Sequence, residues 1–115
     1  MDVAARNEVV LVGRVAAGPE ERTLPSGDIL LIWRLVVDRP RPGRAAPEGV
    51  RVPTVHTLDC VAWATKVRRS AAGFRAGDVV TVEGALRRRF WRAGAGAVSR
   101  CEIEVLRVKR LQRAA

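Results

Sequence analysis

Three arginines followed by two aromatic residues are the most distinctive chemical feature of this 115-residue chain. Arg87, Arg88 and Arg89 directly precede Phe90 and Trp91. Guanidinium groups neutralise phosphates, and an aromatic ring offers a face on which a base can stack. Side by side, these two residue types are typical of a groove that holds single-stranded nucleic acid. An arginine run is equally typical of a solvated face, so this segment alone leaves both interpretations open.

These side chains continue a segment whose pattern predicts a β-strand. From Asp78 to Gly84, β-branched residues alternate with polar ones, which indicates one buried face and one wet face. Gly84 interrupts the alternation, as a bulge or a close approach of backbone would require. If the strand continues beyond it, alternation sends Arg88 to the side opposite Arg87 and Arg89.

The charge of the chain is large and unevenly distributed. Lys and Arg number 21 against 12 Asp and Glu, a net charge of +9. Residues 87–115 contain nine basic and two acidic residues, so seven of these net charges lie in the last quarter of the chain. A basic balance of this size favours a polyanionic partner such as nucleic acid.

The composition excludes several other classes of protein. No window approaches the roughly eighteen consecutive apolar residues of a membrane span, and the N-terminus lacks the basic and apolar regions of a secretion signal. We therefore expect a cytoplasmic protein. Cys60 and Cys101 are too few for a disulfide scaffold and lack the CxxC spacing of a zinc site. Their apolar sequence surroundings predict two small buried side chains.

His56, Asp59 and Cys60 are the residues that a catalytic or metal site would use. In a strand, His56 and Cys60 share one face while Asp59 points to the other, and the chain has only one His. No Walker glycine loop, paired-carboxylate motif or HExxH motif is present. The sequence therefore predicts no enzyme, no metal site and no cofactor.

The rest of the chain predicts four further strands and one helix. The expected strands span 7–15, 29–37, 54–63 and 98–111, and the expected helix spans 64–74. With the strand that starts at Asp78, the order becomes β-β-β-α-β-β. Five strands with one helix between the third and fourth indicate an all-β OB-fold, a Greek-key barrel that binds oligonucleotides or oligosaccharides. Trp33 should lie in its core, and Phe74 should close the helix onto the barrel.

We expect a single domain over 7–111, with an N-terminal tail at 1–6 and a C-terminal tail at 112–115. Within it, residues 38–53 form a long loop that holds four prolines and four arginines without an apolar period. A loop of this length is often functional, and its basic character favours a flap that closes over an anion. Residues 16–27 are expected to form a hairpin loop, because Pro25 and Gly27 suit a tight reversal.

With these motifs identified, the chain resembles the bacterial single-stranded DNA-binding protein family. Residues 7–14 (NEVVLVGR) are similar to that family's opening strand, and residues 77–91 (GDVVTVEGALRRRFW) to its fourth strand and basic hairpin. The likeness spans about residues 7–111. It implies sequence-independent binding of single-stranded DNA, near the nucleoid, during replication, repair or recombination.

The resemblance also implies roles for individual residues. Trp63 and Trp91 fall on positions where the family places base-stacking aromatics, and Arg87 and Arg89 fall on its basic hairpin. Together with cations of the second strand, the long loop and the flanking turns, they form the predicted nucleic-acid-binding set. Its members are Arg14, Arg34, Arg39, Arg41, Trp63, Arg75, Arg87, Arg89, Trp91 and Arg92.

An excess of apolar residues predicts self-association. These residues fall on strand faces that should point away from the barrel core: Val10, Val12, Leu30, Ile32 and Val36. A contiguous exposed apolar patch marks an interface, and closed symmetry makes a dimer or a dimer of dimers the expected assembly. The resemblance implies a homotetramer.

Two alternatives and one departure from the family remain. The barrel could be an OB-type module for RNA or for replication restart, or a protein-interaction barrel that binds no nucleic acid. Family members usually carry a Gly/Pro-rich linker and an acidic tip that recruits other proteins, and this sequence ends at Ala115 without either. The resemblance therefore implies a tail-less paralogue or a trimmed core.

Overall fold

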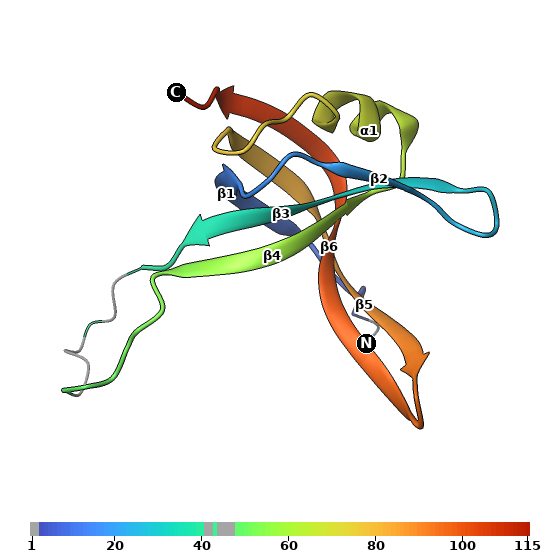
Figure 1. Ribbon diagram of the computed structural model, residues 1–115, viewed down its shortest axis with the longest axis horizontal. Coiled ribbons are helices and arrows are strands. Elements are labelled where there is room, and N and C mark those ends of the chain that lie inside the picture. Colours follow the sequence, from blue (N-terminus) through green and yellow to red (C-terminus); the bar gives the residue numbers. More distant parts are fainter. Residues whose placement is uncertain (1–2, 41–42, 44–47) are drawn as a thin grey trace.

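A computed structural model describes residues 3–40, 43 and 48–115 of the chain (Figure 1). In these residues six strands and one short helix follow one another. They are β1 (Val9–Val15), β2 (Glu20–Thr23), β3 (Ile29–Asp38), β4 (Val55–Ala62), α1 (Thr65–Ala71), β5 (Val79–Ala93) and β6 (Gly96–Gln112).

The strands form one sheet that closes on itself as a barrel. The sheet order is β1-β5-β6-β4-β3-β2, and β1 pairs additionally with β3. The β1–β3 contact is short, with Arg14 opposite Val36 and Val15 opposite Leu35, but it joins the first of the five barrel strands in this order to the last, and β2 lies outside the closure. All pairings are antiparallel except β4 with β6. Strands β1, β3, β4, β5 and β6 are the five strands of the predicted barrel, with α1 between the third and fourth of them.

Strand β2 is an addition to the predicted elements. It lies within residues 16–27, which were expected to form only a loop, and pairs with β3 alone, at the edge of the sheet. The connection that contains it also corrects one side-chain prediction. Leu30 was expected to point outward, but it is only 5% exposed. Residues Ala16 to Leu24 of this connection line the same cavity as Leu30, so they cover this end of β3.

The core fills the barrel with side chains that alternate along each strand. Val80 and Val82 on β5 are fully buried, as is Leu35 on β3. Trp33 is 4% exposed and meets the Phe74 ring edge-on, with ring centroids 6.1 Å apart and planes at 90°. The predicted core position of Trp33 and the predicted closing role of Phe74 are confirmed.

Helix α1 is shorter than the predicted 64–74. Ala64 keeps an extended backbone, so the helix begins at Thr65, and Val67 and Ala71 form its buried stripe. The amide of Phe74 donates to the carbonyl of Ala71 in a tighter turn. This turn ends the helix and carries the Phe74 ring into the core.

Two glycines allow close approaches of backbone that any side chain would block. A Cβ at Gly13 would collide with the Val36 carbonyl, where β1 crosses to β3. A Cβ at Gly84 would collide with the Glu104 carbonyl, and the β5–β6 register shifts between Glu83 and Gly84. The bulge predicted at Gly84 is thus present.

Beyond Leu86 and its partner Ile103, β5 and β6 leave the barrel as a two-stranded arm (Figure 1). The arm ends at the pair Ala93–Gly96, and Gly94 in the turn has a φ of 60°. A glycine at the first central position is what a type II′ hairpin turn requires. The turn therefore contains only Gly94 and Ala95, and β6 begins two residues before the predicted start of the last strand at 98.

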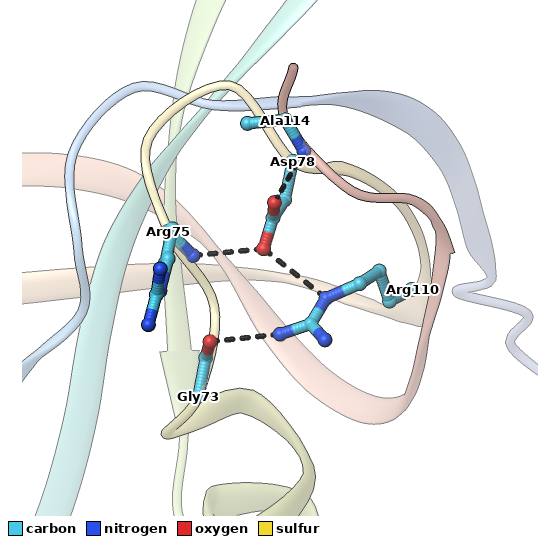
Figure 2. Close-up of polar contacts among 5 residues, drawn as sticks. All are labelled: Gly73, Arg75, Asp78, Arg110 and Ala114. Atoms are coloured by element: carbon cyan, nitrogen blue, oxygen red, sulfur yellow. Dashed lines mark hydrogen bonds and ion pairs between the residues drawn. The ribbon is translucent and has the colours of Figure 1, made fainter.

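A buried carboxylate ties the chain end to the barrel (Figure 2). Asp78 accepts hydrogen bonds from the backbone amides of Ala114 and Arg75, each 2.8 Å long, and forms an ion pair with Arg110 Nε at 3.1 Å. Arg110 Nη2 also donates to the Gly73 carbonyl at 2.7 Å. The two backbone amides, above all that of Ala114, lower the pKa of Asp78 below its usual value. Part of the segment expected as a tail, 112–115, is therefore anchored.

The two cysteines differ in their surroundings. Cys60 is fully buried in the barrel, and burial, with a smaller contribution from Asp59, raises the pKa of its thiol to about 12. Cys101 is exposed, so its predicted burial is wrong. It lies opposite Arg88 on the arm, where the strands have left the core.

No helix among the described residues has the length and hydropathy that a bilayer span needs.

Candidate nucleic-acid interface

The arm presents two chemically distinct faces. From Gly84 to Ala93 the β5–β6 register has no irregularity, so side chains alternate strictly between the faces. We call one the front face, formed by β5 residues and their β6 partners: Arg87, Arg89, Trp91, Val98, Arg100 and Glu102. We call the other the back face: Arg88, Phe90, Arg92, Ala97, Ser99 and Cys101. The Arg88 side chain thus lies on the face opposite to that of Arg87 and Arg89, as alternation predicted.

Two tryptophans, Trp91 on the front face and Trp63 just after β4, each lie against a guanidinium of the front face. The Arg89 guanidinium lies 5.1 Å from the Trp91 ring centroid, and that of Arg87 lies 5.6 Å from the Trp63 ring centroid. Contacts of this length are cation–π interactions, in which the cation lies over the face of the ring. Trp91 is 39% exposed, so part of its ring is free to stack on a base.

Trp63 is held more firmly than Trp91. Its side chain is half-buried at the end of β4, and its indole Nε1 is buried without a hydrogen-bond partner. Its backbone carbonyl accepts a 3.0 Å hydrogen bond from Arg68 Nε on α1. The Trp63 backbone is therefore tied to α1, and its ring lies against Arg87.

A groove of about 450 Å³ runs between the arm and the barrel. The connection Ala16–Leu24 lines one part of it, β3 and β4 contribute Ile32, Arg34, Asp59 and Val61, and the front face contributes Arg89, Arg100 and Glu102. In OB-folds the ligand lies on the corresponding strands, between the first hairpin and the last. The groove thus occupies the usual binding position of this fold.

Three carboxylates line the groove, those of Glu20, Asp59 and Glu102, and Asp59 pairs with two of the groove arginines. Asp59, whose side chain is about one third exposed, lies 3.5 Å from Arg34 Nε and 3.5 Å from Arg100 Nη1. Each guanidinium has five N–H donors, so one ion pair leaves several for phosphate oxygens. Asp59 therefore holds two cations at the groove without using up their hydrogen-bonding capacity.

Comparison with known proteins identifies the family of this chain. The model of the single-strand binding protein family matches residues 6–111. The chain belongs to this family. It is 31% identical over 112 residues to the single-stranded DNA-binding protein of Deinococcus radiodurans, a match that covers 96% of this chain and 36% of that relative. The chain thus spans little more than a third of that relative's length.

A solved structure of the family has the same fold. The single-stranded DNA-binding protein of Plasmodium falciparum, determined in complex with single-stranded DNA, superimposes with a TM-score of 0.79 and 20% sequence identity. The superposition covers 97% of this chain and 100% of that one. The predicted OB-fold is therefore confirmed for this member of the single-strand binding protein family.

The structure brings only part of the predicted binding set together. Trp63 lies against Arg87, and Trp91 lies against Arg89 on the front face. Arg89 also lines the groove, together with Arg34.

The other members of the predicted set lie elsewhere. Arg14 makes an ion pair with Asp38 at 3.3 Å and does not line the groove. Arg75 lies beside the buried Asp78, and Arg92 lies on the back face. Arg39 is exposed where the long loop begins, with its amide bonded to the Thr54 carbonyl. Arg41 lies outside the described residues.

Sequence reasoning missed two residues of the groove in this family member. Arg100 was not predicted, although counting back from the hairpin turn places it opposite Arg89. Asp59 was considered only for catalysis, and its position opposite Arg34 requires the β3–β4 register. The pairing of Asp59 with Arg100 had no sequence signal, because β4 and β6 are distant in the chain.

Proposed function

We propose that this chain binds single-stranded DNA without sequence preference, in the groove between the arm and strands β3 and β4. The observation that carries the proposal is that Arg89 belongs both to a cation–π pair with Trp91 and to the groove that Arg34 and Arg100 also line. Arg89 with Trp91 and Arg87 with Trp63 supply stacking surfaces, and Arg34 and Arg100 supply additional positive charge. We place this activity in replication, repair or recombination of nucleoid DNA.

The chemistry of these residues accounts for the expected lack of sequence preference. Every base has a π-face that can stack on an indole ring, and every nucleotide has a phosphate that a guanidinium can neutralise. In the Arg89–Trp91 pair the cation covers one side of the ring. A base stacked on the other side would place its phosphate within reach of the basic groove.

The comparisons support single-stranded DNA as the class of ligand. The Deinococcus radiodurans relative is named as a single-stranded DNA-binding protein, and the Plasmodium falciparum protein was solved with single-stranded DNA. The distribution of charge also agrees with a polyanionic ligand, since most of the excess positive charge lies in residues 87–115.

A fluorescence titration with oligo-dT tests the proposal. We expect quenching of tryptophan fluorescence, and a log-log dependence on salt with a slope of about −0.7 for each phosphate neutralised. If the titration at low salt shows no quenching and no change in the anisotropy of a labelled oligonucleotide, the proposal is contradicted. Competition with oligo-rU separates DNA from RNA preference: equal or tighter binding of RNA would favour the RNA-binding alternative.

We further propose that the chain assembles as a homotetramer, a dimer of dimers. On β1, Val10 is 67% exposed and Val12 is 51% exposed, on the outer face of the barrel. Adjacent exposed β-branched residues of this kind favour an interface with another copy. Light scattering should then give a multiple of the 12.6 kDa chain mass, and a clean monomer at micromolar concentration would contradict the assembly.

A further inference from the structure

The back face of the arm carries a second combination of ring and cations. Phe90 is 68% exposed, and the Arg88 guanidinium lies 5.9 Å from its ring centroid. Arg92 follows two positions later on the same face. The back face thus has one aromatic ring between two arginines, whereas the front face has one ring and three arginines.

The back face is free of acidic groups, whereas the front face is not. Its β6 residues are Ala97, Ser99 and Cys101, while the front face contains Glu102 and borders Asp59. Within the part of the chain that the structure describes, neither Arg88 nor Arg92 makes an ion pair. Their charges are therefore available to an anionic ligand.

A structural role does not account for Phe90. The ring lies beyond the barrel and is not part of the core. Because it is not buried there, it does not add to the free energy of unfolding through the hydrophobic effect. A single exposed apolar side chain is common on protein surfaces, but an exposed ring between two arginines has the composition of a stacking site for single-stranded nucleic acid. The charge around it also favours such a ligand: a second copy of this chain carries a net charge of +9, whereas single-stranded DNA is a polyanion.

We propose that the back face of the arm is a second contact surface for the same single-stranded DNA. A base stacks on Phe90, and Arg88 and Arg92 neutralise the neighbouring phosphates. The strand held in the groove continues around the arm, so that the arm is inserted between two segments of one strand. This inference rests on the proposed function, because it requires DNA in the groove.

The shape of the arm permits this path. The arm is only two strands wide, and neighbouring strands lie about 4.8 Å apart. At its tip, a side-chain atom added at Gly94 or Gly96 would meet nothing within 4 Å. No protein group at these positions therefore obstructs a strand that turns from one face to the other.

Oligonucleotide length separates the two surfaces experimentally. We compare labelled oligo-dT of about 5 nucleotides, near the lower end of the roughly 4–16 that one OB-fold covers, with oligo-dT of about 30. Phe90→Ala in the full chain should weaken binding of the long oligonucleotide by at least about fivefold. It should change the affinity for the short one by no more than about twofold. Trp91→Ala should weaken both. Leu111→Ala, which removes a comparably exposed apolar side chain from the far end of β6, should weaken neither.

The outcomes distinguish the inference from the function on which it rests. If Trp91→Ala weakens binding and Phe90→Ala leaves both lengths unchanged, the second surface is refuted and the proposed function stands. If the unaltered chain binds neither length, both fall. If Phe90→Ala lowers the assembly mass without changing DNA affinity, the back face contacts another copy, and the inference is overturned.

A direct contact measurement completes the test. A photo-reactive p-benzoylphenylalanine in place of Phe90 should cross-link the long oligonucleotide, while the same group in place of Leu111 should not. Arg88→Gln should reduce the magnitude of the salt slope for the long oligonucleotide by about 0.7, the contribution of one phosphate. Absence of the cross-link, or an unchanged slope, overturns the inference.

Discussion

Arg89 lies directly opposite Arg100 across the arm, and both side chains line the groove. Like charges at opposing positions of an antiparallel pair destabilise the folded state. Asp59 offsets part of this repulsion through its 3.5 Å contact with Arg100. A bound phosphate would offset the remainder, so this pair is a place where DNA binding relieves an unfavourable interaction.

Arg100→Gln should therefore weaken binding of oligo-dT and reduce the magnitude of the salt slope by about 0.7, the contribution of one phosphate. The free energy of unfolding should change by no more than about 1 kcal/mol, because the lost ion pair with Asp59 is partly exposed and the repulsion by Arg89 is removed. Titrations at several salt concentrations and urea unfolding measure the two quantities. Arg69→Gln, an exposed cation on α1, is the charge-matched control. An Arg100→Gln slope equal to that of the control would exclude Arg100 from the interface.

Trp91 should contribute both affinity and the optical signal. Trp91→Ala should weaken the binding free energy for every single-stranded sequence by about 1–3 kcal/mol, because it removes one stacking surface. Trp91→Phe should keep most of the affinity and lose much of the quenching, since Trp33 is buried and Trp63 is only partly accessible. Anisotropy of a labelled oligonucleotide gives the affinity independently of tryptophan. Unchanged affinity in Trp91→Ala would remove this residue from the site.

The buried Asp78 should make stability depend on pH in the acid range. Its folded-state pKa lies below the ordinary value of 3.8, because the Ala114 and Arg75 amides bind the ionised form. The stabilisation is fully present above about pH 3.8 and is lost as pH falls through the lower folded-state pKa. Asp78→Asn should therefore be less stable than the unaltered chain at pH 7, and the difference should shrink below this pH range. Urea unfolding at neutral and acid pH measures it, with Glu21→Gln on exposed β2 as control. A difference independent of pH would contradict this role of the carboxylate.

Gly84 should tolerate no side chain, because a Cβ there would collide with the Glu104 carbonyl. We expect Gly84→Ala to lower the free energy of unfolding by about 1–3 kcal/mol, the usual cost of overpacking. Gly96→Ala is the matched control, since a Cβ at that position meets only open space. Equal stability of the two variants in urea unfolding would show that the bulge at Gly84 does not need a glycine.

Local periodicity determined much of this protein in advance. Alternation along single strands was enough to predict which segments of the chain form the barrel strands. It also predicted the core position of Trp33 and the opposite orientation of Arg88 and Arg89. The bulge at Gly84 was also predictable, because a glycine inside a regular strand pattern often marks a bulge or a close approach of backbone. Each of these features depends on neighbours in the chain, and their sequence therefore contains the necessary information.

Features that depend on pairing between distant strands were decided only by the tertiary structure. Asp59 meets Arg100 because β4 lies beside β6 in the closed barrel, and Ala114 reaches Asp78 because β6 returns alongside β5. Cys101 has the same local pattern as a buried strand residue, but β6 has left the barrel at that point, so its side chain is exposed. A strand's own periodicity shows which side chains share a face. Which other strand, core or solvent that face meets depends on how the sheet closes.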